Sequence, residues 1–328
     1  MKKTMMFFLC SLFLAAANAS EVQTGFKLES GTSLNSYAGG AASSSMQVNP
    51  DLNLDWRQSM VWEKTTWETD VSAGGAFNVL AKTWGYGGSL YSSVNHQVGA
   101  LLTLEGAASA SQESSLDALS PLLRISGETG MEWRNGKAAF YKMGLSLARE
   151  QFSQFSVSDG DIVGGWLLQS LSFESGRSVR VRLFTDRKMY DNGLADLRYG
   201  GRLGVAQSIG DTRGISLYTE FSNLYGNASL AGQADMPWEE SFGYESKAMG
   251  LLYKTNGTSV DWAVEGRVEW LAPVTTAVPD ETVGNLGLEW TFQSLAGAPF
   301  IKVDMLYRSR DADGTDYAAL NAHVGRWF

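Results

Sequence analysis

The feature that most constrains this chain is a repeated alternation of apolar and polar residues. Successive side chains of a β-strand point to opposite faces, so an alternating segment has one apolar face and one charged face. In a soluble sheet the apolar face packs on a core, whereas in a membrane barrel it contacts lipid and the polar face lines a lumen. The clearest example is 258–271, where Val260, Trp262, Val264, Val268 and Trp270 alternate with Asp261, Glu265, Arg267 and Glu269.

The N-terminal residues 1–19 have the pattern of a secretory signal peptide. Two lysines precede a mostly apolar run over 5–17, and an Ala-x-Ala cleavage site ends at Ala19. The run is too short to cross a bilayer as a helix. We expect cleavage after Ala19, which removes Cys10, the one cysteine, and leaves no thiol for a disulfide or a metal site.

The C-terminal residues 316–328 alternate in the same way and end on Phe328. Together with the signal peptide and the alternating segments between, this end makes the sequence similar to Gram-negative outer-membrane β-barrel proteins. The chain resembles a porin, with no subfamily identified, although Arg326 departs from the aromatic residue usual two positions before the end. The resemblance implies export through the general secretory pathway to the cell outer membrane. It also implies insertion by the barrel assembly machinery, with periplasmic chaperones, which reads Phe328 as an assembly signal.

Composition agrees with a two-faced sheet. Hydrophobic residues make up 44% of the chain, and 36 glycines against six prolines suit strands that curve while keeping their hydrogen bonds. A secreted β-sandwich or propeller has a similar composition and stays open as an alternative. The eleven tryptophans are predicted to form interfacial girdles near strand ends. Those that fit this prediction are Trp56, Trp62, Trp67, Trp133, Trp166, Trp270 and Trp327.

We predict an all-β fold, a transmembrane antiparallel up-and-down β-barrel of about fourteen strands, with twelve or sixteen as alternatives. The barrel is expected over 46–328. The preceding segment 20–45 is interpreted as periplasmic or lumenal, with an extra strand as its alternative. The predicted strands are 46–59, 66–80, 89–106, 121–134, 138–149, 163–175, 178–186, 195–208, 213–224, 242–254, 258–271, 282–294, 299–310 and 316–328.

Connections between these strands alternate between short and long. The short ones contain tight-turn residues, such as Asn135-Gly136, Ser175-Gly176 and Gly210-Asp211. The long ones are polar, for example 150–162 and 225–241. Outer-membrane barrels have short periplasmic turns and longer extracellular loops, so the alternation predicts which end faces the periplasm.

Charged residues on the predicted lumen face separate by sign. On two successive strands the apolar residues face outward, which turns four arginines inward as a basic wall. Carboxylates on other strands are predicted to form a facing acidic wall. Such an arrangement orients charged solutes and sorts them by sign. The basic wall is Arg180, Arg182, Arg198 and Arg202, and the acidic wall is Asp55, Glu68, Asp70, Glu265 and Glu269.

Catalysis finds little support in the sequence. Barrel hydrolases work with a histidine beside Ser, Asp or Glu, and this chain has only His96 and His323. The alternation places His96 on the lipid face and His323 on the lumen face near the periplasmic end. No phosphate loop, dinucleotide fingerprint or zinc spacing is present. We therefore predict no enzymatic activity, no cofactor, no catalytic or metal-binding residues and no nucleic-acid partner.

These observations favour an outer-membrane channel for passive diffusion of small hydrophilic solutes, with anions the favoured class. The alternatives are a non-conducting structural or surface barrel, a polysaccharide-export barrel and, with less support, a barrel hydrolase. The partners expected are outer-membrane lipid, lipopolysaccharide and the solutes themselves. We expect the protein to be a monomer.

Overall fold

Strands account for almost all of the described backbone. The structure, a computed structural model, describes residues 21–38, 45–79, 82–114, 123–136, 138–152, 159–226, 244–273, 280–295, 298–310 and 316–327. The strands in those ranges are β1 (Glu21–Ala38), β2 (Ser45–Trp62), β3 (Thr65–Asn78), β4 (Thr83–Gln97), β5 (Leu102–Ser114), β6 (Leu123–Asn135), β7 (Ala139–Gln151), β8 (Gly160–Ser172), β9 (Arg177–Tyr190), β10 (Ala195–Ile209), β11 (Arg213–Gly226), β12 (Tyr244–Thr255), β13 (Asp261–Pro273), β14 (Glu281–Thr291), β15 (Phe300–Arg310) and β16 (Asp316–Trp327).

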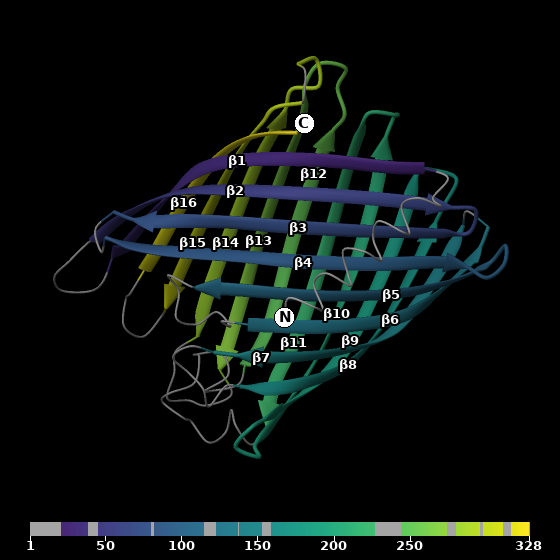
Figure 1. Cartoon of the computed structure of the whole chain (residues 1–328), viewed down its shortest axis with the longest axis horizontal. Coiled ribbons are helices and arrows are strands. Elements are labelled where there is room, and N and C mark those ends of the chain that lie inside the picture. The colour runs from purple at the N-terminus through teal and green to yellow at the C-terminus, as the bar shows by residue number, and fades with distance from the viewer. Residues whose placement is uncertain are drawn as a thin grey trace, which may run out of the picture.

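These sixteen strands of the described residues form one closed antiparallel barrel. Each strand pairs with its neighbours in sequence, and β1 pairs with β16 to close the ring. In Figure 1 the purple and blue strands β1–β4 cross in front of the yellow-green strands β12–β16, as strands on opposite walls of a tilted barrel do. The predicted antiparallel up-and-down barrel is confirmed. The count of about fourteen strands was wrong, and sixteen, one of the alternatives, is correct.

Two segments account for the two missing strands. Residues 20–45, interpreted first as periplasmic or lumenal, contain β1, which is their stated alternative of an extra strand. The predicted strand 89–106 combines parts of two strands, β4 and β5, which are separated by the connection 98–101. That connection is apolar, with Gly99 as its single usual turn residue, while β5 is rich in Ala and Ser and reads like a loop.

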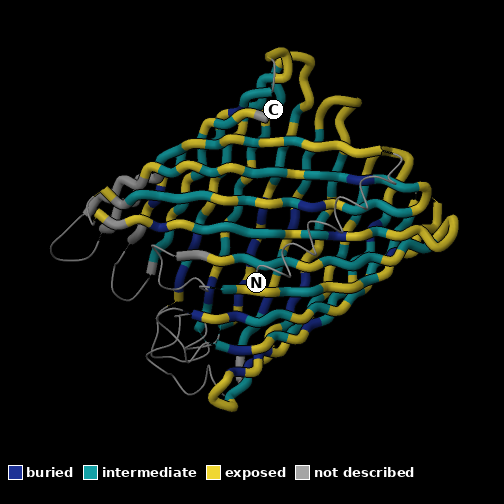
Figure 2. Tube along the Cα trace, viewed as in Figure 1, coloured by how far each residue is buried: buried dark blue, intermediate teal, exposed yellow. Residues whose placement is uncertain are grey.

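Exposure is the reverse of that in a soluble protein. Many large apolar side chains are exposed and face outward; Leu145 is 65% exposed and Met249 60% exposed. Several buried side chains are instead charged and face inward, among them Lys188, Asp196 and Glu281. Exposure also alternates along many strands in Figure 2. A lipid-facing apolar surface around a polar lumen is the arrangement of a transmembrane barrel.

The two ends of the barrel differ in their connections. We call the turn end the one that contains the connections 63–64, 98–101, 136–138, 173–176, 210–212, 256–260 and 292–299. The opposite end is the loop end. At the turn end Gly136 and Gly210 have φ values of 62° and 64°, a left-handed conformation that glycine adopts without a steric penalty. The predicted tight turns at these two positions are therefore present.

Outward-facing aromatic pairs lie near both ends. At the turn end Trp62 lies 6.5 Å from Trp67 between ring centroids, and Tyr253 lies 5.0 Å from Trp262. At the loop end Phe77 and Trp84 are 4.8 Å apart. These pairs have the positions of interfacial girdles. Within the described residues, no helix is long and apolar enough to cross a membrane.

Candidate functional site

The four arginines of the basic wall lie on the lumen side of β9 and β10. Alternate residues of β9, such as Leu183, are apolar and exposed on the outer face, which turns Arg180 and Arg182 inward. In the register between these strands Arg202 is directly opposite Arg182, and Arg198 is opposite Asp186. The strand pairing therefore brings all four arginines together on one wall.

Two of the four arginines have partners on the same wall. Arg198 Nε lies 3.2 Å and 3.0 Å from the two carboxylate oxygens of Asp186, and its Nη2 lies 2.8 Å from Oδ2. The Arg202 guanidinium lies over the Tyr218 ring, 3.5 Å from the ring centroid. Such a cation–π contact contributes about 0.5–1 kcal/mol at an exposed site.

Arg180 and Arg182 make no ion pair or hydrogen bond through their side chains within the described residues. Arg182 also stands opposite another arginine, a like-charged pairing that costs stability in a sheet. Their charges are therefore not offset by a protein carboxylate, and they remain available to a solute.

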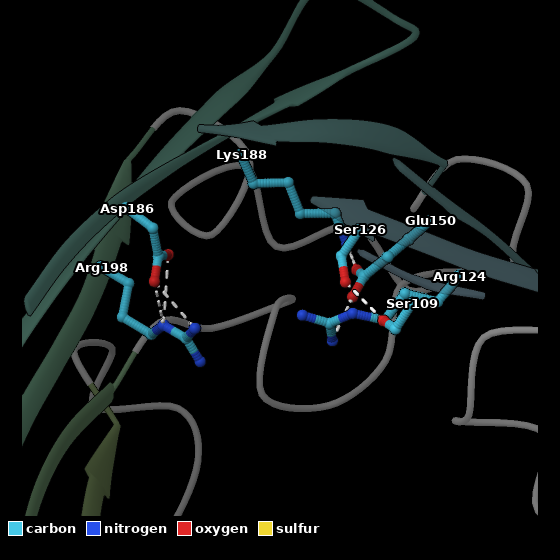
Figure 3. A network of polar contacts seen from close by, with 7 residues as sticks. All are labelled: Ser109, Arg124, Ser126, Glu150, Asp186, Lys188 and Arg198. Atoms are coloured by element: carbon cyan, nitrogen blue, oxygen red, sulfur yellow. Dashed lines mark hydrogen bonds and ion pairs between the residues drawn. The ribbon is translucent and has the colours of Figure 1, made fainter. Parts of the chain in front are cut away.

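A network of polar contacts, drawn in Figure 3, lies on this wall. Glu150 and Lys188 are near the ends of β7 and β9, so the network continues the wall toward the loop end. Glu150 accepts contacts from two cations: Arg124 Nη1 lies 2.9 Å from its Oε1, and Lys188 Nζ lies 3.1 Å from its Oε2. The Lys188 side chain is only 8% exposed, so its ammonium is held by Glu150. Beside them the Ser109 and Ser126 hydroxyls are 2.6 Å apart.

Two adjoining cavities lie against this wall. One of about 540 Å³ is bordered by Arg180, and one of about 500 Å³ extends to Arg198. Arg182 and Arg202 border both, and so do Trp166 on β8 and Glu128 on β6. These volumes are within the range of small-molecule sites.

Trp166 corrects one sequence-based prediction. It was expected in an interfacial girdle, but it borders both lumen cavities and therefore faces inward. β8 carries apolar residues on both faces, for example Leu167 and Leu168, so its alternation does not indicate which face is outward.

The predicted acidic residues fall into two separate groups rather than one wall. Asp55, Glu68 and Asp70 lie on β2 and β3, where Asp70 Oδ1 is 2.7 Å from Arg57 Nε. Asp55 Oδ2 lies 3.9 Å from Lys27 Nζ.

The second acidic group lies on β13. Glu265 borders a third cavity of about 360 Å³, together with Glu289 and Asp304. Glu269 lies 3.0 Å from Arg267, and Arg267 borders the same cavity as Arg198. Glu269 is thus on the side of the basic wall, and pairing with Arg267 offsets its charge.

Sequence reasoning missed several lumen residues that extend these groups. Glu29 adds a carboxylate beside Asp51 and Asp55, and all three border one cavity of about 600 Å³. Alternation around Leu28 would have placed Glu29 on the lumen face, but 20–45 was not assigned to the barrel. Alternation could have found two more lumen residues. Lys188 is an even number of positions from Arg182 on β9, and Arg124 is an even number of positions from Glu128 on β6, so each lies on the same face as that residue.

The two histidines lie on different faces. His96 Nδ1 is 2.8 Å from the Thr65 hydroxyl, in the row of Val94 on the outer face. His323 Nδ1 lies 3.4 Å from Glu29 Oε1 and 3.5 Å from Asp51 Oδ1 on the lumen face. In the described part of the chain, no group of three or more His, Cys, Asp or Glu residues is arranged to hold a metal ion. The predicted signal peptide 1–19 and the predicted assembly signal Phe328 lie outside the described residues.

Comparison with solved structures identifies the fold. No protein-family model matches the sequence, and no curated protein matches it. The chain is similar to OccK1 (OpdK) of Pseudomonas aeruginosa at a TM-score of 0.54 and 11% identity, over 93% of this chain and 98% of that one. It is similar to a BenF-like porin of Pseudomonas fluorescens at a TM-score of 0.55 and 11% identity, over 95% and 99%.

A third similar barrel, OccK2 (OpdF) of Pseudomonas aeruginosa, was solved in complex with glucuronate; it has a TM-score of 0.54 and 11% identity, over 93% of this chain and 98% of that one. At such identities the similarity concerns the fold alone. This chain has the fold of a porin-like β-barrel.

Proposed function

We propose that this protein is an outer-membrane channel through which small hydrophilic anions diffuse passively. The observation that carries the proposal is the order of cations along β9 and β10. From the loop end inward, Lys188 is followed by Arg198, then by Arg182 opposite Arg202, then by Arg180. Because Arg180 and Arg182 have no carboxylate partner in the described residues, this row keeps a positive potential along the lumen.

The distribution of carboxylates strengthens this potential. β1 lies eight steps from β9 in the ring of sixteen described strands, and the carboxylates of Glu29, Asp51 and Asp55 lie on β1 and β2. An anion entering the lumen is repelled from that side and attracted to the arginines, so its path follows β9 and β10.

Bound molecules in similar barrels have compatible chemistry. OccK2 was solved with glucuronate and OpdK with vanillate, and both molecules carry a carboxylate. A guanidinium binds a carboxylate in a bidentate geometry, which suits Arg180 and Arg182.

The location and partners follow from the same proposal. The signal peptide supports export through the general secretory pathway, and the apolar outer face supports residence in the outer membrane, in contact with lipid and lipopolysaccharide. Insertion would use the barrel assembly machinery and periplasmic chaperones. We propose a monomer that works without an enzymatic step.

The test is single-channel conductance of refolded protein in a planar bilayer, with the reversal potential measured under a salt gradient. A steady conductance with a reversal potential on the anion side supports the proposal. A silent bilayer, with a folded barrel confirmed by heat-modifiable gel mobility, contradicts it and favours a structural barrel. Polysaccharide export and hydrolysis would then be assayed.

Removing the unpaired arginines should change selectivity while leaving the barrel intact. We expect Arg180→Ala combined with Arg182→Ala to lower the anion-to-cation permeability ratio by about twofold or more, because two fixed positive charges leave the lumen. Both side chains are exposed in the lumen, so heat-modifiable mobility should be retained. Arg57→Ala is the matched control, because it removes an arginine of β2 that is already paired with Asp70 of β3. It should change the anion-to-cation permeability ratio less. Unchanged selectivity in the double variant would contradict the proposed role of the wall.

A further inference from the structure

Trp166 lies on the lumen wall in a space that two glycines leave open. A Cβ added at Gly144 would lie 2.7 Å from Trp166 Cζ2, and one added at Gly130 would lie 3.4 Å from it. The indole therefore covers the backbone of β6 and β7. Its Nε1 is buried without a hydrogen-bond partner, so hydrogen bonding of the indole does not explain its position.

Trp166 is an aromatic ring of this wall that no protein cation covers. Phe184 and Tyr218 have the guanidinium groups of Arg198 and Arg202 over them. Within the described residues no such cation lies over Trp166, although its ring borders both cavities. An uncovered indole in a polar lumen offers a stacking surface to a flat solute.

Opposite charges without partners lie on either side of this ring. Glu128 on β6 makes no ion pair or hydrogen bond through its side chain among the described residues, and the same holds for Arg180 and Arg182 on β9. Glu128 and Arg182 nevertheless border the same two cavities. Because the Glu128 carboxylate and the Arg182 guanidinium border the same cavities and form no ion pair, a space remains between them.

The strand register places Trp166 in that space. Following the pairs from β6 to β8, Glu128 is level with Gly164; following the pair from β9, Arg182 is level with Leu168. Trp166 is midway between those two residues. The strands of Glu128 and Arg182 are three spacings apart, about 14 Å, and their levels differ by four residues along the strands, about 13 Å, so the two positions are about 19 Å apart along the wall. Extended Glu and Arg side chains cover most of the separation and leave room for a molecule about one ring long.

We propose that this cleft binds a small zwitterion whose carboxylate and ammonium lie at opposite ends of a flat frame. The frame stacks on Trp166, the carboxylate contacts Arg180 and Arg182, and the ammonium contacts Glu128. This inference rests on the proposed function, since it requires a lumen open to solutes, and it names a solute class for that lumen. Glu128 also repels solutes with a second carboxylate, which adds discrimination.

The test compares two probes of the same size. 4-(Aminomethyl)benzoate is a zwitterion with its charges at opposite ends of a ring, and 4-ethylbenzoate is the matched anion, in which a methyl group replaces the ammonium. Binding to the full, refolded barrel in detergent is measured by titration calorimetry, which does not depend on conduction. We expect the wild-type protein to bind the zwitterion about tenfold more tightly than the anion, as a charge-assisted hydrogen bond allows. Equal dissociation constants for the two probes would overturn the proposal.

Variants identify the two contacts. Glu128→Gln should weaken zwitterion binding by about tenfold and leave the anion unchanged or slightly tighter. Glu289→Gln, a lumen carboxylate of β14 at a different cavity, is the control and should change neither. Trp166→Ala should weaken both probes, while Trp166→Phe keeps a ring and should retain most of the binding. An equal effect of Glu128→Gln on both probes, or unchanged binding in Trp166→Ala, would overturn the assignment.

Reversal potentials of the same proteins separate the two proposals. An anion-preferring channel that does not distinguish the two probes contradicts only the zwitterion site. A barrel without conductance or anion preference that still binds the zwitterion through Glu128 contradicts the channel proposal and leaves the binding site standing.

Discussion

Aromatic side chains on the lumen face repeatedly cover a glycine of the neighbouring strand. Phe184 covers Gly200, and a Cβ at that glycine would lie 2.6 Å from Phe184 Cζ. Tyr218 covers Gly250, and Trp166 covers Gly144 in the same way. Each ring fills space that a side chain would otherwise occupy. The glycines therefore determine where the rings lie, and with Tyr218 they determine where Arg202 can stack.

Replacing one of these glycines should destabilise the barrel. In Gly250→Ala the new methyl group would overlap the Tyr218 ring, which must move and lose its contact with Arg202. We expect the free energy of unfolding in urea to fall by about 1–3 kcal/mol, the usual cost of overpacking. Gly266→Ala is the control, because a Cβ there has no atom within 4 Å and should change stability by less than about 0.5 kcal/mol. Equal stabilities of the two variants would contradict this account.

At the residue scale, alternation predicted which side of the barrel a side chain faces, but it did not predict which residue the side chain contacts. Arg180 and Arg198 were both placed on the lumen face because their strands carry clear apolar rows. The pairing of Arg198 with Asp186 depends on the register between strands, which no single segment encodes. Trp166 was assigned to the wrong surface because both faces of β8 are apolar.

An ion pair on the outer rim of the loop end connects β7 to the hairpin of β9 and β10. Arg149 Nη1 lies 2.7 Å from Asp191 Oδ1, and Nη2 lies 2.5 Å from Oδ2, a bidentate geometry. Asp191 begins the connection 191–194, which follows β9. Hydrogen bonding to the Arg149 guanidinium holds the pKa of the Asp191 carboxyl below its ordinary value of 3.8.

This pair gives a pH prediction for the hairpin. Because the pKa of Asp191 is lower in the folded protein, the pair stabilises the hairpin at neutral pH, and that contribution is lost as pH falls through the lowered pKa, below 3.8. Carboxyl chemical shifts of Asp191 followed by NMR should report the lowered pKa. Arg149→Gln should raise it toward the ordinary value, whereas Arg187→Gln on the outer face of β9 should leave it unchanged. A pKa of Asp191 that does not respond to Arg149→Gln would contradict the role of the pair.

Elements with strong alternation were predicted within a few residues, and the weak ones were not. β10 was expected at 195–208 and spans Ala195–Ile209. β5 was missed because its lipid face carries Gly106, Ala108 and Ala110, which bury little apolar surface and give little periodic signal. Such a strand is held by the ladders to β4 and β6, an interaction between segments that a single-segment pattern does not contain.

Across the whole molecule, the distribution of charge varies around the circumference of the barrel rather than along the barrel axis. Basic residues concentrate on β9 and β10, while Glu29, Asp51 and Asp55 border one other cavity and Glu265, Glu289 and Asp304 border another. The sequence predicted opposite signs on separate strands, and the structure also places a carboxylate on the basic wall, where Asp186 pairs with Arg198. The sequence did not predict that the carboxylates form two groups. It also did not predict that Glu269 pairs with Arg267.

The end of the chain yields a prediction about assembly. Deleting Phe328 should reduce the amount of barrel inserted in the outer membrane, because the resemblance to outer-membrane barrels implies that the assembly machinery reads this residue. The folded fraction is measured by heat-modifiable mobility of outer-membrane extracts. Phe328→Tyr keeps a terminal aromatic ring and is the matched control. Normal insertion of the truncated chain would argue against this signal.

The pairing of β1 with β16 determines when the barrel can close during assembly. Lys27 is the register partner of Trp327, so the seam of the cylinder joins residues three hundred positions apart. A chain is synthesised and exported from its N-terminus, so the first strand emerges long before its partner exists. Until then both margins of the growing sheet have unpaired backbone groups, which in hydrocarbon are costly and in water invite aggregation. Closure must therefore follow the delivery of the whole polypeptide, and damage to the last dozen residues would leave the earliest strand without its neighbour.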